Sequence, residues 1–138
     1  MKKSLYFNKF GITAILFFIL SVNLTLAQST SSFRGMDLLN DSTAWISGSK
    51  GTVVYSVDYG NHLTVRSPKG FEKKDFRDIS ALNDSTIVVM SAGDSAVILK
   101  TSNKGKTWQT VYSDFRKGIF LDVLKFNKTN GIGIALGD

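Results

Sequence analysis

The chain has 138 residues, of which 43% are hydrophobic and 20% are charged, with no cysteine and a formal net charge of +6. These values are ordinary for one globular domain, and they exclude a disulfide framework, a cysteine-based zinc site and a thiol nucleophile. The first 27 residues hold three lysines and no acid, so the rest carries only +3, and no nucleic-acid partner is expected.

The N-terminal segment is predicted to be an export signal. A lysine-containing start precedes the apolar stretch 11–20, which is about half the roughly 20 residues that a membrane-spanning helix needs. Small residues at Thr25 and Ala27 predict cleavage after Ala27, so that Gln28 begins the mature chain. An uncleaved signal anchor is the alternative. The protein is expected to be periplasmic, cell-surface or secreted, and to meet a membrane only through this segment.

The remainder of the chain, residues 28–138, is an internal repeat. Phe33–Arg34 and Leu39–Thr43 recur 43 residues later as Phe76–Arg77 and Leu82–Thr86. The match continues at an offset of 45, and a third copy opens near Phe120. A period of about 43–45 residues is that of one β-propeller blade.

Each period is predicted to form four short strands. In the second copy, strands are expected over 76–82, 86–90, 96–100 and 107–112, because apolar and β-branched residues alternate with polar turn clusters. A short helical turn is left open for residues 115–126. The predicted fold class is therefore all-β, with four-stranded antiparallel propeller blades.

The turn before the fourth strand carries the most specific motif. Thr101–Trp108 fits the pattern S/T-x-D/N-x-G-x-T-W, and Ser56–Leu63 fits its first half. The pattern resembles the bacterial neuraminidase repeat, or Asp-box, and the spacing resembles propellers of the photosystem II stability/assembly-factor-like and sortilin-like group. Asn103 stands where that family has Asp, and His62 and Leu63 stand where it has Thr and Trp.

The motif residues are expected to shape turns and not to catalyse. An Asp or Asn side chain accepts hydrogen bonds from nearby backbone N–H groups, and glycine adopts positive φ at little cost. The resemblance implies that these turns lie at the blade periphery. The predicted structural residues are Ser56, Asp58, Gly60, Thr101, Asn103, Gly105, Thr107 and Trp108.

Two arginines occupy the same position in successive copies. Arg34 and Arg77 are expected to project toward one rim or the central channel, where they would present a small basic surface to carboxylates or an acidic partner. Simple solvation of arginines at a strand edge is the alternative.

The sequence predicts no catalytic residues, no metal ligands and no cofactor. Glu72 is the single glutamate after residue 27 and lies in a charged loop, whereas glycoside hydrolysis generally requires two facing carboxylates. His62 is the only histidine and is interpreted as a turn residue.

The chain is expected to hold about two and a half blades, whereas a closed propeller has about four to eight. Blade 1 is predicted at about 31–68, blade 2 at about 74–114 and the start of blade 3 at about 118–138. This predicts the N-terminal part of a longer propeller, and the alternative is a short chain that associates into a ring.

The predicted function is that of an exported, non-catalytic propeller that serves as a binding or assembly scaffold for a protein or a glycan. The alternative is a glycoside hydrolase of sialidase or xyloglucanase type, because such propellers share the Asp-box turns. In that case the catalytic residues would lie mostly outside this chain.

Overall fold

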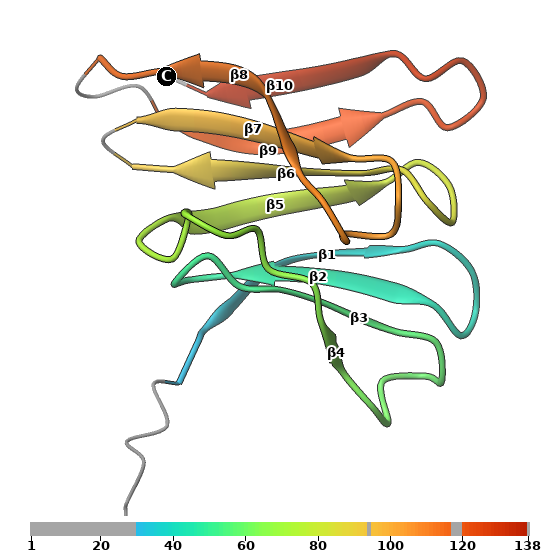
Figure 1. Ribbon diagram of the computed structural model, residues 1–138. Helices are drawn as coiled ribbons and strands as arrows, with labels where there is room; N and C mark the ends of the chain where they lie inside the picture. The colour runs from blue at the N-terminus through green and yellow to red at the C-terminus, as the bar shows by residue number, and fades with distance from the viewer. Residues whose placement is uncertain (1–29, 94, 117–119, 138) are drawn as a thin grey trace, which may run out of the picture.

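The computed structural model describes residues 30–93, 95–116 and 120–137. The predicted export signal and its cleavage residue Ala27 lie outside these ranges. Within them, every regular element is a β-strand, and ten strands form three antiparallel sheets that stack in layers (Figure 1). The all-β fold class and the four-stranded propeller-type blades predicted from the sequence are confirmed.

The first two sheets each contain four strands in chain order. The first sheet comprises β1 (Phe33–Leu38), β2 (Ala44–Gly48), β3 (Val53–Ser56) and β4 (Thr64–Val65). The second comprises β5 (Asp75–Ala81), β6 (Ile87–Ala92), β7 (Ala96–Thr101) and β8 (Gln109–Asp114). The observed strands of the second sheet begin and end within two residues of the predicted ones, because the alternating pattern and the turn clusters are unambiguous there.

The third sheet pairs β9 (Leu121–Phe126) with β10 (Gly133–Gly137). Residues 121–126, for which a helical turn was left open, are therefore extended. Val123, a β-branched residue, suits the strand, and the Asn127–Ile132 turn closes the hairpin with a backbone hydrogen bond of 2.8 Å.

The hydrophobic core lies between the sheets. Trp45 and Val53 of the first sheet pack against Ile79, Val89 and Leu99 of the second. On the opposite face of the second sheet, a smaller cluster joins it to the third sheet, with Val88, Met90 and Leu124 fully or almost fully buried. The second sheet is thus covered on both faces, and all six residues of β6 are buried.

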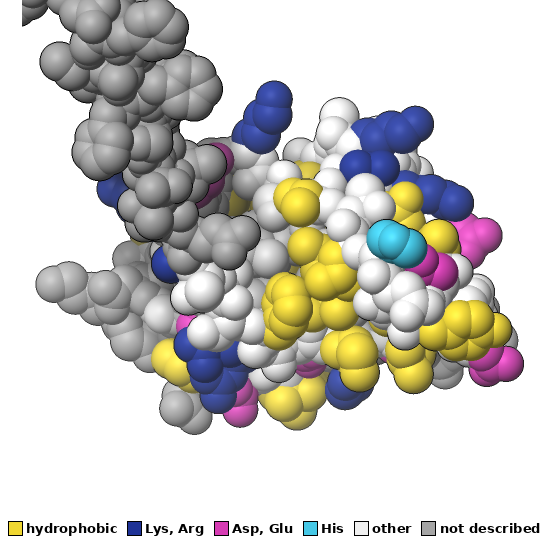
Figure 2. All heavy atoms as spheres, turned by 90° about the horizontal axis from the view of Figure 1, so that it is seen from below, with side chains coloured by type: hydrophobic (Ala, Val, Ile, Leu, Met, Phe, Trp, Pro, Cys, Tyr) yellow, Lys and Arg dark blue, Asp and Glu magenta, His cyan; other side chains and the backbone are white. Residues whose placement is uncertain are grey.

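The corresponding face of the first sheet is open. Phe33 and Met36 are 53% and 60% exposed, whereas Phe76 and Ile79, at the same positions of the next repeat, are 0% and 1% exposed. Leu38 and Val65 lie on the same open face, and Figure 2 shows apolar side chains gathered on this side of the molecule. Repeat position alone therefore does not determine burial, because a neighbouring sheet must supply the cover.

Candidate functional site

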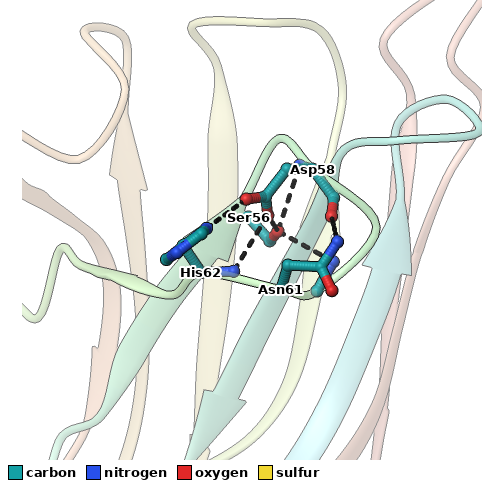
Figure 3. Close-up of polar contacts among 5 residues, drawn as sticks. Ser56, Asp58, Asn61 and His62 are labelled. Carbon is teal, nitrogen blue, oxygen red and sulfur yellow. Dashed lines mark hydrogen bonds and ion pairs between the residues drawn. The ribbon is translucent and has the colours of Figure 1, made fainter.

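The turn that joins β3 to β4 is organised by one hydroxyl and one carboxylate (Figure 3). The Ser56 hydroxyl accepts hydrogen bonds from the Gly60 N–H at 2.9 Å and from the Asp58 N–H at 3.3 Å, and it donates to Asp58 Oδ1 at 2.8 Å. Asp58 Oδ1 also accepts the backbone N–H of His62 at 3.0 Å. These local bonds close the turn, and the Tyr59 N–H also donates to the backbone carbonyl of Ser42 at 3.1 Å.

The turn that joins β7 to β8 repeats this scheme. Thr101 Oγ1 accepts the Gly105 N–H at 3.0 Å and donates to Asn103 Oδ1 at 2.9 Å. Asn103 Oδ1 accepts the Thr107 N–H at 2.9 Å, and the Asn103 amide donates to the Thr107 hydroxyl at 2.8 Å. Asparagine therefore makes the same backbone contact in the second turn as aspartate makes in the first.

The two turns differ in charge. His62 Nδ1 lies 2.5 Å from Asp58 Oδ2, and because an ionised carboxylate can only accept, the proton between them resides on the imidazole. The His62 side chain, followed by the His62 backbone N–H and the Ser56 hydroxyl, lowers the pKa of Asp58 from 3.8 to about 2. The first turn therefore contains a titratable hydrogen bond at a place where the second turn contains a neutral one.

Trp108 fixes the second turn to the first sheet. Its indole Nε1 donates to the backbone carbonyl of Arg66 at 2.8 Å, and its ring packs against the core between the two sheets. A Cβ added to Gly105, which has a φ of +72°, would lie 2.7 Å from Arg66 Cβ. Leu63, at the position of Trp108 in the first turn, is 45% exposed. The second turn is thus an inter-sheet contact as well as a hairpin.

The first strands of the three sheets, β1, β5 and β9, lie next to one another and form what we call the first-strand edge. Each strand has a register shift near its start, and the residues skipped in the pairing are Arg34, Arg77 and Asp122. A bulge of this kind redirects a side chain out of the regular alternation. The structure therefore places the two sequence-predicted rim arginines at matching bulges, and it adds Asp122 to the same row.

Both arginines bridge to the next sheet. Arg34 Nε lies 3.3 Å from Asp75 Oδ1, and Arg77 Nε lies 2.9 Å from Asp122 Oδ1. The Arg77 guanidinium also lies 5.7 Å from the centroid of the Phe120 ring. The arginine side chains are 42% and 41% exposed, so both guanidiniums are accessible to solvent, and ion pairs of this kind contribute little to stability.

Polar contacts also join the sheets near the ends of the first strands. Asp37 accepts the Ala81 N–H at 2.8 Å, and Lys128 reaches across to Asp37 Oδ2 at 3.2 Å. Asp78 accepts the Leu124 N–H at 2.8 Å. Sequence reasoning missed these three residues because Asp37 and Asp78 do not occupy equivalent repeat positions. The only available signal was an acid within a strand of mixed apolar and polar residues.

The remaining polar candidates have local roles. Glu72 accepts the Gly70 N–H at 2.9 Å, and this bond lowers the pKa of the Glu72 carboxyl. Within residues 30–93, 95–116 and 120–137, no group of three or more His, Cys, Asp or Glu side chains is arranged to hold a metal ion. The same part of the chain holds no helix with the length and apolar character needed to cross a membrane.

No family model and no curated protein sequence matches the chain. Several solved structures match the chain. The structure titled YCF48 from Cyanidioschyzon merolae aligns with a TM-score of 0.54 and 19% identity, over 68% of this chain and 30% of that one. The structure titled YCF48 bound to D1 peptide aligns with a TM-score of 0.58 and 16% identity, over 71% of this chain and 31% of that one. The chain thus spans less than a third of these relatives and shares the fold of β-propeller blades.

Proposed function

We propose that this chain supplies blades of an exported, non-catalytic propeller that binds a protein segment at the first-strand edge. The observation that carries the proposal is the pair of arginines at matching bulges of β1 and β5. One of the similar propeller structures is titled as bound to a D1 peptide, which supports a peptide partner for this fold.

The geometry at the arginines suits a carboxylate ligand. Among the described residues, each guanidinium uses Nε for its ion pair, and each side chain is about two-fifths exposed. The planar terminal N–H groups of arginine bind a carboxylate in a bidentate manner, which lysine does not do. We therefore propose that the partner presents acidic side chains or a free C-terminal carboxylate to Arg34 and Arg77.

A peptide library with free C-terminal carboxylates tests this proposal. Peptides are selected for binding to the full chain, and their affinities for the Arg34→Gln and Arg77→Gln variants are measured by fluorescence anisotropy. The control variant is Arg116→Gln, because Arg116 is an exposed arginine that pairs with Asp114 on the second sheet. Loss of one charged hydrogen bond weakens binding about tenfold or more. We expect this loss for the first two variants only. If the double variant Arg34→Gln, Arg77→Gln binds the peptides as tightly as the unsubstituted chain, the proposal is wrong. A glycan array probed with the same variants tests a glycan as the alternative partner.

We also propose that the two turns belong to the Asp-box class. Their shared hydrogen-bond scheme, with a hydroxyl at the first position and a carboxylate or amide at the third, supports this assignment. A structural role predicts that Thr101→Ala lowers stability by about 1 kcal/mol without changing peptide affinity. Loss of affinity in a variant that remains folded would point to a binding role instead.

Export is a separate proposal, which rests on the sequence of residues 1–27. N-terminal sequencing of the protein recovered outside the cytoplasm of a bacterial host is expected to begin at Gln28. Ala27→Arg is expected to block processing, because signal peptidase requires a small residue at −1. A mature chain that retains residue 1 would show that the segment is an anchor or is not a signal.

A further inference from the structure

The turn that joins β9 to β10 contains the one Asn-Gly pair of the chain, Asn130–Gly131. Both residues are exposed, and Gly131 has a φ of +71°. Because glycine has no side chain, nothing on Gly131 shields its backbone nitrogen from the side chain of the preceding asparagine. This nitrogen and the Asn130 side-chain carbonyl carbon, Cγ, are the two atoms that must meet to close a five-membered imide ring.

The hydrogen bonds of the turn favour attack on the Asn130 amide. The Ile132 N–H donates to Asn130 Oδ1 at 3.0 Å, and this oxygen gains negative charge when a nucleophile adds to the amide carbonyl. Among the described residues, no acceptor binds the Asn130 Nδ2, so the leaving group is unrestrained. The Gly131 N–H donates to the Asn127 carbonyl at 2.8 Å, so the nitrogen becomes available when this bond opens. Bonds in an exposed turn open more readily than those of a buried strand.

The other five asparagines of the described residues lack this combination. Each is followed by a residue that has a side chain, and each uses its amide group in a hydrogen bond within its own turn. They are Asn40, Asn61, Asn83, Asn103 and Asn127. Asn103 is held at both ends of its amide, because Oδ1 accepts the Thr107 N–H and Nδ2 donates to the Thr107 hydroxyl. The structure therefore distinguishes Asn130 from the rest.

We propose that Asn130 is a site of spontaneous modification, at which the side-chain amide is lost and an isoaspartyl link forms in the β9–β10 turn. The Gly131 nitrogen bonds to Asn130 Cγ as the Cγ–Nδ2 bond breaks, and the proton of that nitrogen leaves with the amide group as ammonia. Water then opens the imide. Its addition at Cγ gives aspartate, and its addition at the main-chain carbonyl gives isoaspartate. The site is separate from the first-strand edge, and the proposal depends neither on the arginines nor on export.

Isoaspartate lengthens the backbone of a turn whose two ends are paired. It adds one methylene group to the main chain between residues that are joined by the hydrogen bond from the Asn127 N–H to the Ile132 carbonyl, 2.8 Å long. Lys128, in the same turn, reaches Asp37 of the first sheet. The isoaspartyl product is therefore expected to loosen both the hairpin and this contact. The aspartyl product keeps the backbone length and an acceptor for the Ile132 N–H, so it is expected to leave the hairpin intact.

Peptide mapping by mass spectrometry, during incubation of the full chain near neutral pH, tests the proposal. We expect Asn130 to be the first asparagine converted among the described residues, with isoaspartate and aspartate distinguished by electron-transfer fragmentation. The Ile132 amide should exchange its hydrogen faster in the isoaspartyl fraction than in the unmodified chain. Asn130→Gln should react about tenfold or more slowly, because its longer side chain has to close a six-membered ring.

Lys104→Gly separates the structural argument from the Asn-Gly sequence alone. Lys104 has a φ of +58°, which suits glycine, and the substitution creates a second Asn-Gly pair in which Thr107 holds the Asn103 amide. In this variant we expect Asn130 to react about tenfold or more faster than Asn103, because one amide is free to reach the attack geometry and the other is held away from it. Equal rates at the two sites would overturn the proposal. So would an unmodified Asn130 in the parent chain after a free peptide of residues 127–133 has been fully converted.

Discussion

The indole of Trp108 donates its hydrogen bond to the backbone carbonyl of Arg66, which lies 2.8 Å away and directly follows β4 of the first sheet. Above this contact, the Arg66 guanidinium lies 5.3 Å from the centroid of the Tyr55 ring, and Tyr55 stacks on Trp45. A residue that the sequence motif assigns to a hairpin turn therefore joins two blades. At the same position of the first turn, Leu63 is 45% exposed.

Trp108→Ala is expected to lower the free energy of unfolding by about 3 kcal/mol, because it removes a packed aromatic ring and leaves the Arg66 carbonyl without its donor. Urea denaturation followed by circular dichroism measures the change. Leu63→Ala, at the same position of the first turn, is expected to change stability by less than about 0.5 kcal/mol because Leu63 is solvent-exposed. Similar losses for both variants would show that Trp108 does not join the sheets.

The two motif glycines are expected to respond differently to alanine. Gly60 and Gly105 both have positive φ, which costs an alanine about 1–2 kcal/mol. A Cβ at Gly60 meets no atom within 4 Å, whereas a Cβ at Gly105 clashes with Arg66. Gly105→Ala is therefore expected to destabilise the protein more than Gly60→Ala in the same denaturation assay. A reversed order would contradict the close approach of the second turn to Arg66.

Acid is expected to open the first turn selectively. The pKa of Asp58 in the folded chain, about 2, lies below its ordinary value of 3.8, so the ionised carboxylate stabilises the turn above about pH 4. This stabilisation is lost as the pH falls from about 4 to about 2. Hydrogen exchange of the His62 amide should accelerate over this range beyond the intrinsic pH dependence, whereas the Thr107 amide, held by Asn103, should not.

Asn103→Asp provides the complementary test. The variant is expected to fold, because a carboxylate accepts the Thr107 N–H as the amide oxygen does. It should make the second turn acid-sensitive in the same pH range. If the Thr107 amide stays equally protected at pH 2 and pH 5 in this variant, the carboxylate does not control the turn.

Asp78→Ala is expected to loosen the third sheet without unfolding the second. Asp78 accepts the Leu124 N–H across the sheet interface, and removal of the carboxylate leaves that donor unpaired at a cost of about 1–3 kcal/mol. Faster exchange of the Leu124 amide, with unchanged exchange in β6, is the expected result. Asp122→Ala is a suitable comparison, because its exposed ion pair with Arg77 contributes little.

The sequence allowed the strands and turns to be predicted because their determinants are local. Alternation over 76–82 and the Asn-Asp-Ser cluster at 83–85 define a strand and its turn without reference to any other part of the chain. The hydroxyl, carboxylate or amide and glycine of each motif likewise lie within five residues of one another. Such bonds depend on spacing, and spacing is visible in a sequence.

Contacts between sheets were not predictable in the same way. Alignment of the repeats by phenylalanine pairs Phe120 with Phe76, but in the structure Leu121 packs toward the second sheet and Asp122 forms the bulge. Two adjacent apolar residues satisfy the pattern equally well, so only the packed interface selects one. The contact between Asp37 and Lys128 could not be predicted for a related reason, since it joins residues about 90 positions apart.

The complete burial of β6 implies an order of opening for the molecule. In a stack where each sheet protects only its neighbours, the middle sheet has the highest local unfolding free energy, and the outer strands open first from either side. Amides of β6 should therefore exchange at a rate set by global unfolding, while β1 and β10 exchange through smaller fluctuations. The second blade is in this sense the most stable part of the described residues.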